Sequence, residues 1–154
     1  MFLNCTSLTV SPELPATTLA HSCYWSMFYG CTSLVEAPEL PATNLASHCY
    51  LGMFEGCTSL VNAPELPATE LADSCYCCMF SGCSSLVNVP VKLPATTLAD
   101  FCYSSMFSDC KKLKDSPLIS GNNLTYVEGA LYYMFSNCSL LSSVSVAFNE
   151  WDNA

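Results

Sequence analysis

Apolar residues come in adjacent pairs that recur every four positions along several stretches of the chain. Between residues 44 and 56, where polar or small residues separate them, the pairs are Leu45-Ala46, Cys49-Tyr50 and Met53-Phe54. On a helix this spacing forms one wide apolar stripe, so we predict a helix from about Asn44 to Glu55. Thr43 suits the N-cap position of this helix and Gly56 the C-cap position.

The whole pattern repeats along the chain. The motif M-F-x-x-C occurs in six copies, which end at Cys5, Cys31, Cys57, Cys83, Cys110 and Cys138. The first three intervals between these cysteines are 26 residues, and the last two are 27 and 28. A period of this length is typical of a solenoid, in which each unit buries its apolar face against its neighbours. We predict one domain over residues 1–154, with a partial first unit at 1–5 and the end of the array, or the start of a cap, at 139–154.

Each unit also has room for one short strand. A leucine follows each motif cysteine by three residues, and a proline follows that leucine in five units. We therefore expect a short parallel strand in each unit, for example around Leu34 to Ala37. Because proline has no N–H to donate to a sheet, the proline column predicts a narrow sheet that stops there. The predicted fold class is an α/β solenoid with one strand and one helix in each repeat of about 26 residues.

Twelve cysteines allow three interpretations. The eight-residue spacing of Cys23 and Cys31 does not fit the close cysteine pairs that hold zinc. Cysteines on packed helices would lie roughly 8–10 Å apart, which is too far for a disulfide. Cysteines beside neighbouring strands would lie roughly 4.8 Å apart, so a disulfide is an alternative there. We favour free, buried thiols that fill the core. Cys77 and Cys78 occupy variable positions, so we expect them to be the most exposed and reactive thiols.

Composition excludes several functions. With 13 acidic residues, four basic residues and a formal charge of −9, the chain is unsuited to nucleic acid. No apolar run reaches the roughly 18 residues of a membrane span, so we expect no membrane insertion. No signal peptide is visible, and the opening residues match the interior of the repeat, as in a fragment or an internal start. His21 and His48 occupy different repeat positions and lack a fixed serine or carboxylate neighbour, so we expect no enzyme, no metal and no cofactor.

Two further columns each have two interpretations. Glu13, Glu39 and Glu65 form an acidic column that suits either a calcium site or a solvated edge, and we favour the edge. The second column contains tyrosines next to cysteines, which we interpret as core lining rather than a ligand platform. Its members are Tyr24, Tyr50, Tyr76 and Tyr103.

The repeat units resemble a known family. The stretches "CTSLVEAPELPATNLASHCYLGMFEG" and "CTSLVNAPELPATELADSCYCCMFSG" are similar to the BspA-like leucine-rich repeats of bacterial surface proteins. The shared core is M-F-x-G-C-x-S-L, and the resemblance covers nearly the whole chain. It implies a curved α/β solenoid at the cell surface or outside the cell that displays a surface for adhesion, with no catalytic residues to carry over.

We therefore expect a non-enzymatic recognition or adhesion module that binds a protein or a glycan. The candidate contacts lie two residues after each repeat leucine, vary between units and are mostly polar: Val10, Glu36, Asn62, Asn88 and Asp115. The alternative is a structural spacer with no ligand of its own. The open ends of a solenoid also favour end-to-end self-association.

Overall fold

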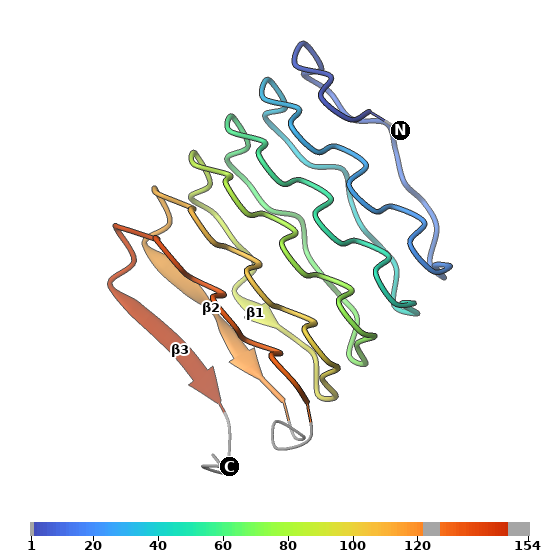
Figure 1. Cartoon of the computed structure of the whole chain (residues 1–154), viewed down its shortest axis with the longest axis vertical. Coiled ribbons are helices and arrows are strands. Elements are labelled where there is room, and N and C mark those ends of the chain that lie inside the picture. The colour runs from blue at the N-terminus through green and yellow to red at the C-terminus, as the bar shows by residue number, and fades with distance from the viewer. Residues whose placement is uncertain (1, 122–126, 148–154) are drawn as a thin grey trace.

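The chain winds into a stack of flattened coils that lie side by side from the N-terminus to the C-terminus (Figure 1). The computed structural model describes residues 2–121 and 127–147. These residues contain three strands, β1 (Lys92–Leu93), β2 (Asp115–Ser120) and β3 (Ser143–Ala147), which form one parallel sheet in the order β1-β2-β3. The same described ranges contain no helix.

The prediction of an α/β solenoid with a helix in each repeat is therefore wrong, and so is the leucine-rich-repeat architecture that the resemblance implied. Residues 44–55 do not form a helix, because their backbone N–H groups alternate between two kinds of acceptor. The Cys49 N–H bonds to the Ala46 carbonyl in the same coil (3.2 Å), whereas the Tyr50 N–H bonds to the Cys75 carbonyl in the next coil (3.0 Å). One set of backbone N–H groups therefore closes tight turns within a coil, and the alternate set forms hydrogen bonds to the next coil.

This arrangement occupies one long side of every coil. We call the stretches concerned turn segments, first to fifth in chain order: residues 21–31, 47–57, 73–83, 100–110 and 128–138. Every fourth residue in a turn segment has a positive φ; in the second segment these are His48 (60°), Gly52 (57°) and Gly56 (73°). A left-handed residue cannot continue a right-handed α-helix. Four-residue turns that point two side chains inward and two outward therefore produce the apolar pairs that the sequence shows.

The other long side of the coil carries the strands, and here the predictions are partly wrong. Around Leu34 to Ala37 there is no strand, only isolated parallel bridges that join Glu36 to Asn62 and Asn62 to Asn88. The predicted stop at proline fails in the later coils. Pro117 lies inside β2, and β2 residues beyond it pair with Lys92 and Leu93 of β1. β2 accommodates the proline through an irregularity in its register with β3 between Asp115 and Leu118.

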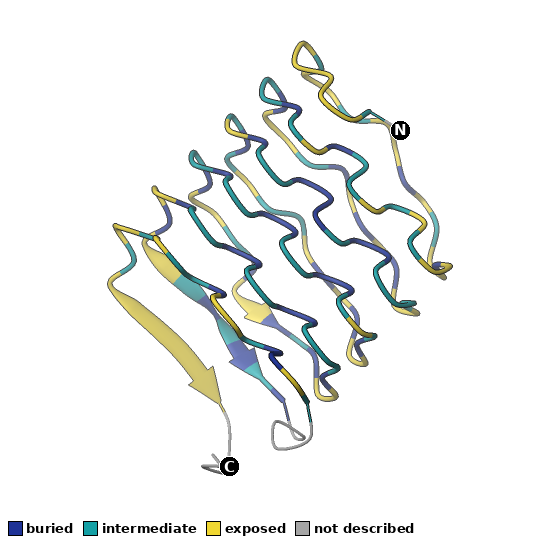
Figure 2. Ribbon diagram, viewed as in Figure 1, coloured by how far each residue is buried: buried dark blue, intermediate teal, exposed yellow. Residues whose placement is uncertain are grey.

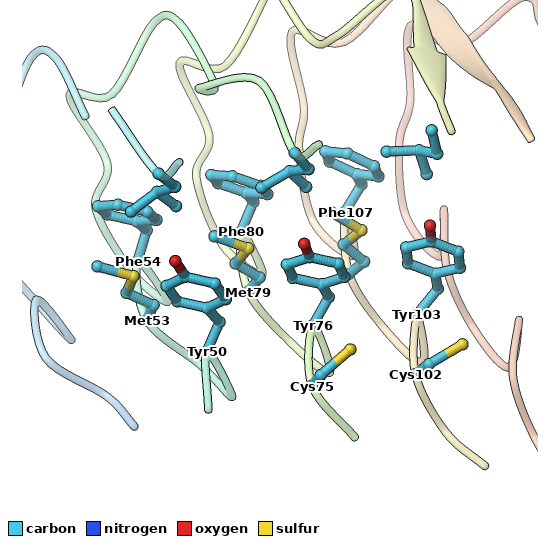
Figure 3. Close-up of a cluster of buried hydrophobic side chains, with 14 of the residues drawn as sticks. Tyr50, Met53, Phe54, Cys75, Tyr76, Met79, Phe80, Cys102, Tyr103 and Phe107 are labelled. Carbon is cyan, nitrogen blue, oxygen red and sulfur yellow. The ribbon is translucent and has the colours of Figure 1, made fainter. Parts of the chain in front are cut away.

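Between the two sides, like residues stack on like residues. Phenylalanine rings from successive coils lie 5.5–5.7 Å apart, centroid to centroid, with interplanar angles of 4–7°. A parallel tyrosine ladder has spacings of 5.7–5.9 Å (Figure 3). Tyr50, Tyr76 and Tyr103 are each 1% exposed, which confirms that they line the core. Figure 2 shows this burial in the middle coils and greater exposure toward both ends of the stack.

All twelve cysteines are free, so the disulfide alternative is not found. The prediction of buried free thiols is confirmed for seven: Cys31, Cys49, Cys57, Cys75, Cys83, Cys102 and Cys110. The expectation that Cys77 and Cys78 are the most exposed thiols is wrong, because both are half-buried while Cys5 and Cys23 are exposed.

The motif cysteines have a structural role that explains their recurrence. From Cys31 onward, each of the five motif thiols donates a hydrogen bond to the carbonyl of the motif phenylalanine in the preceding coil. Examples are Cys57 to Phe28 (3.1 Å) and Cys83 to Phe54 (3.1 Å). The same carbonyl also accepts the turn-closing N–H of its own coil, as Phe54 does from Cys57 (3.0 Å). This position requires tight packing and a second hydrogen-bond donor to the phenylalanine carbonyl. Cysteine meets both requirements, because its side chain is small and its S–H group is a weak donor.

Candidate functional site

The predicted contact residues are all exposed, and three of them come together. Glu36, Asn62 and Asn88 lie in register on successive coils, and the Asn88 side-chain amide donates to Asn62 Oδ1 at 2.6 Å. Asp115 begins β2 and pairs with Ser143 of β3 rather than with this group. Val10 is 76% exposed on the first coil and forms no described bridge. The structure thus joins the central column by bridges, and no described bridge extends it to Val10 or Asp115.

Sequence reasoning missed the exposed valines that precede this column. Val35 is 45% exposed and Val87 is 41% exposed, although valine in a short strand pattern normally indicates core. The Val87 N–H donates to the Val61 carbonyl at 3.0 Å, and the Val61 N–H donates to the Val35 carbonyl at 3.2 Å. The signal was available in the sequence, because each valine stands between a buried leucine and a polar residue, where only one neighbour can point inward.

A second feature of this long side is a pair of grooves formed by the stacked P-E-L-P segments. One groove of about 480 Å³ lies between the first two segments and is lined by residues that include Pro12, Glu13, Pro38 and Glu39. The next groove, of about 300 Å³, continues to Glu65 and its flanking prolines. Glu13, Glu39 and Glu65 are all exposed, as a solvated edge requires. In the described residues, no group of three or more His, Cys, Asp or Glu side chains is arranged to hold a metal ion.

Charge is distributed unevenly along the stack. All four basic residues lie between positions 92 and 114, so residues 1–91 contain no Lys or Arg. The same residues contain seven acidic side chains: Glu13, Glu36, Glu39, Glu55, Glu65, Glu70 and Asp73. Among the described residues, one ion pair is present, between Lys111 and Asp109 at 2.6 Å, and it lies in the later coils. The first three coils therefore carry negative charge without internal compensation.

The two histidines lie closer together than the sequence suggested. They are 27 residues apart, one more than the repeat, yet the ring centroids of His21 and His48 lie 5.4 Å apart, with the ring planes tilted by 47°. Ser22 Oγ lies 3.0 Å from His21 Nδ1, and the buried Nδ1 of His48 has no described partner. No carboxylate hydrogen bonds to either ring among the described residues, so the pair lacks the third group that would orient a general base.

Comparison with known proteins gives no relative. No family model, no curated protein and no solved structure matches this chain. Within the described residues, no helix is long and apolar enough to span a bilayer.

Proposed function

We propose that this protein is a non-enzymatic binding module that recognises a positively charged protein segment. The observation that carries the proposal is the uncompensated negative charge of residues 1–91, which contain seven acidic residues and no Lys or Arg; four of the seven, Glu13, Glu36, Glu39 and Glu65, are exposed on the side opposite the turn segments. Glu36, Asn62 and Asn88 supply polar contacts on this part of the stack, and the exposed valines beside them supply apolar ones. An extended surface of this kind steers an oppositely charged partner and aligns it.

The proline-lined grooves strengthen the case for a peptide partner. Proline faces are apolar and rigid, so the grooves around Glu13 and Glu39 keep their shape without a ligand, and little ordering cost remains for binding. A peptide that carries Lys or Arg together with apolar side chains matches both the carboxylates and the proline faces. The proposed cell-surface or extracellular location rests on the resemblance to BspA-like repeats alone.

Binding to an immobilised array of cationic peptides, neutral peptides and glycans tests the proposal. We expect cationic peptides to bind, with an affinity that falls as salt rises. The triple variant Glu13→Gln/Glu39→Gln/Glu65→Gln should weaken binding about tenfold, since each exposed charge pair contributes roughly 0.2–1 kcal/mol. Glu128→Gln, which removes an exposed charge from the fifth turn segment, is the matched control. Equal binding to neutral peptides, or no effect of the triple variant, would contradict the proposal.

A spacer function is the second candidate, and the regularity of the stack favours it. The phenylalanine ladder runs without a break from Phe2 to Phe135, as a rigid rod requires. A spacer predicts no binding to any member of the peptide and glycan array. The same array therefore distinguishes the two candidates.

We also propose that copies associate end to end. In the fifth turn segment, the N–H groups of Leu131 and Tyr133 donate to no described acceptor, although their counterparts in earlier segments bond to the next coil. In the first turn segment, the carbonyls of Cys23 and Trp25 accept from no described donor. Donors at one end and acceptors at the other favour head-to-tail contact. An average molar mass from light scattering that rises with protein concentration would support this contact, and a constant monomer mass would exclude it.

A further inference from the structure

The third turn segment differs from the other four in carrying two adjacent cysteines on its outward side. Cys77 and Cys78 occupy the positions that Ser104 and Ser105 occupy in the next segment. Their Sγ atoms lie 3.6 Å apart, and both side chains are half-buried. Unlike the motif cysteines, neither thiol bonds to a phenylalanine carbonyl, so the core does not explain this pair.

The backbone holds the pair in place from both sides. The Gly52 N–H donates to the Cys77 carbonyl at 2.8 Å, and the Cys78 N–H donates to the Ser104 carbonyl at 2.8 Å. Gly52 occupies the position of Cys78 in the preceding turn segment, and Ser105 occupies it in the following one. Glycine has no side chain and serine has a small one. The backbone that carries the two thiols is therefore held on both sides, and the neighbours of Cys78 in its column are small.

This geometry favours chelation over oxidation. Two sulfur atoms 3.6 Å apart bind one centre at an angle of about 103° when each bond is about 2.3 Å long, which is a typical metal–thiolate length. A disulfide instead needs sulfur atoms about 2.05 Å apart and Cα atoms at least about 4.4 Å apart, whereas Cα atoms across one trans peptide bond are about 3.8 Å apart. Chelation needs no change in the backbone, and a disulfide does.

The proton distribution also suits a thiophilic ligand. A hydrogen bond from Cys78 lowers the pKa of Cys77, and a second bond with the Ser104 side chain lowers it further. The same hydrogen bond, with Cys78 as donor, raises the pKa of Cys78. The pair therefore offers one more acidic thiol, which attacks first, and one less acidic thiol, which follows. Glu55 lies close enough to disfavour additional negative charge at both sulfur atoms, so an uncharged ligand fits better than an anion.

We propose that Cys77 and Cys78 form a chelating site for uncharged trivalent arsenic compounds that carry one organic group. In the reaction R–As=O + 2 R′SH → R–As(SR′)₂ + H₂O, two As–S bonds form, two S–H bonds break, and both protons leave with the oxygen as water. Arsenic stays trivalent, so no oxidant is needed. Its third bond remains to the organic group, which fits a site where the described residues provide no third protein ligand.

Titration of the native protein with phenylarsine oxide, followed by intact mass, tests the site. We expect one adduct per chain, reversed by a competing dithiol such as ethanedithiol and resistant to a monothiol at equal thiol concentration. Cys77→Ser and Cys78→Ser should each weaken binding at least about 100-fold, because the second As–S bond then loses its intramolecular advantage. Both variants are expected to fold, because serine occupies both positions in the next turn segment.

The control variant is Cys5→Ser/Cys23→Ser, which removes the two exposed single thiols. It should bind phenylarsine oxide with unchanged affinity and stoichiometry. Binding that survives in both single variants of the pair, or that disappears in the control variant, would overturn the proposal. So would a wild-type protein that takes up no arsenical at all.

Discussion

Replacing one ring of the phenylalanine ladder should cost far more in the middle of the stack than at its end. Phe80 is 0% exposed and lies between Phe54 at 5.5 Å and Phe107 at 5.6 Å. Phe80→Ala removes the buried ring and both stacking contacts, so we expect a loss of about 3–5 kcal/mol in the free energy of unfolding. Phe2 is half-buried and has one ring partner, Phe28. Phe2→Ala should cost about 1–2 kcal/mol, in proportion to its smaller burial and single stacked neighbour.

Urea unfolding followed by near-ultraviolet circular dichroism measures this difference, because the buried tyrosines report on packing. The expected gap of about 2 kcal/mol corresponds to roughly a 30-fold difference in the unfolding equilibrium. An unchanged slope with urea would show that both variants unfold from the same folded state. Equal costs for Phe80→Ala and Phe2→Ala, or a cost below about 1 kcal/mol for Phe80→Ala, would refute the stacked ladder.

Three further predictions concern the turns and the thiols. Gly82 has φ +72°, so Gly82→Ala should lower the urea midpoint by the equivalent of about 1–2 kcal/mol. Gly82→Asn should cost less, since Asn4 and Asn137 hold the same turn position at φ 55° and 58°; equal effects would contradict this. Burial raises the pKa of Cys57 to about 12 and of Cys49 to about 11 from 9.0. Above pH 9 the unfolded chain loses these protons first, so stability should fall by up to about 1.4 kcal/mol per pH unit per thiol; constant stability from pH 8 to 10.5 would count against burial. Ellman titration in denaturant should find twelve free thiols, with Cys5 and Cys23 the fastest to react in native protein; a lower count would show disulfides.

The sequence predicted the columns of the stack correctly because stacking depends only on the length of the repeat. Once the 26-residue period is aligned, the motif phenylalanines and the core tyrosines must meet their counterparts, whatever the backbone does between them. The central contact column, Glu36, Asn62 and Asn88, was placed in register for the same reason. The contact between the two histidine rings was not predicted, because His21 and His48 are 27 residues apart, one more than the repeat.

The backbone conformation was not predictable from apolar spacing alone. An α-helix advances about 100° per residue, so side chains four positions apart drift by only about 40°. Over the three apolar pairs of residues 45–54, this drift still leaves one stripe, and a helix fits as well as a row of four-residue turns. The missing signal was a period of four in residues that tolerate a left-handed backbone. Gly52 and Gly56 show it, but Cys78 and Phe101 occupy such positions too and conceal it.

The strand boundaries were also underdetermined. Proline normally marks the edge of paired backbone, and single bridges before Pro38 and Pro64 agree with this. In the last coils the chain tolerates Pro117 within β2, because an irregular register places the missing donor where no ladder bond is needed. That accommodation depends on the contacts of neighbouring coils, which a single unit of sequence does not contain.

The hydrogen bond of the Tyr50 amide tests the stacked-turn architecture most directly. In isotopically labelled protein, the scalar coupling through this bond joins the Tyr50 amide nitrogen to the carbonyl carbon of its acceptor. The structure predicts a coupling to Cys75, one coil further along the chain, across a nitrogen–oxygen distance of 3.0 Å. A helix over residues 44–55 would instead couple Tyr50 to Ala46, four residues earlier. Observation of the Ala46 coupling, with none to Cys75, would contradict the account.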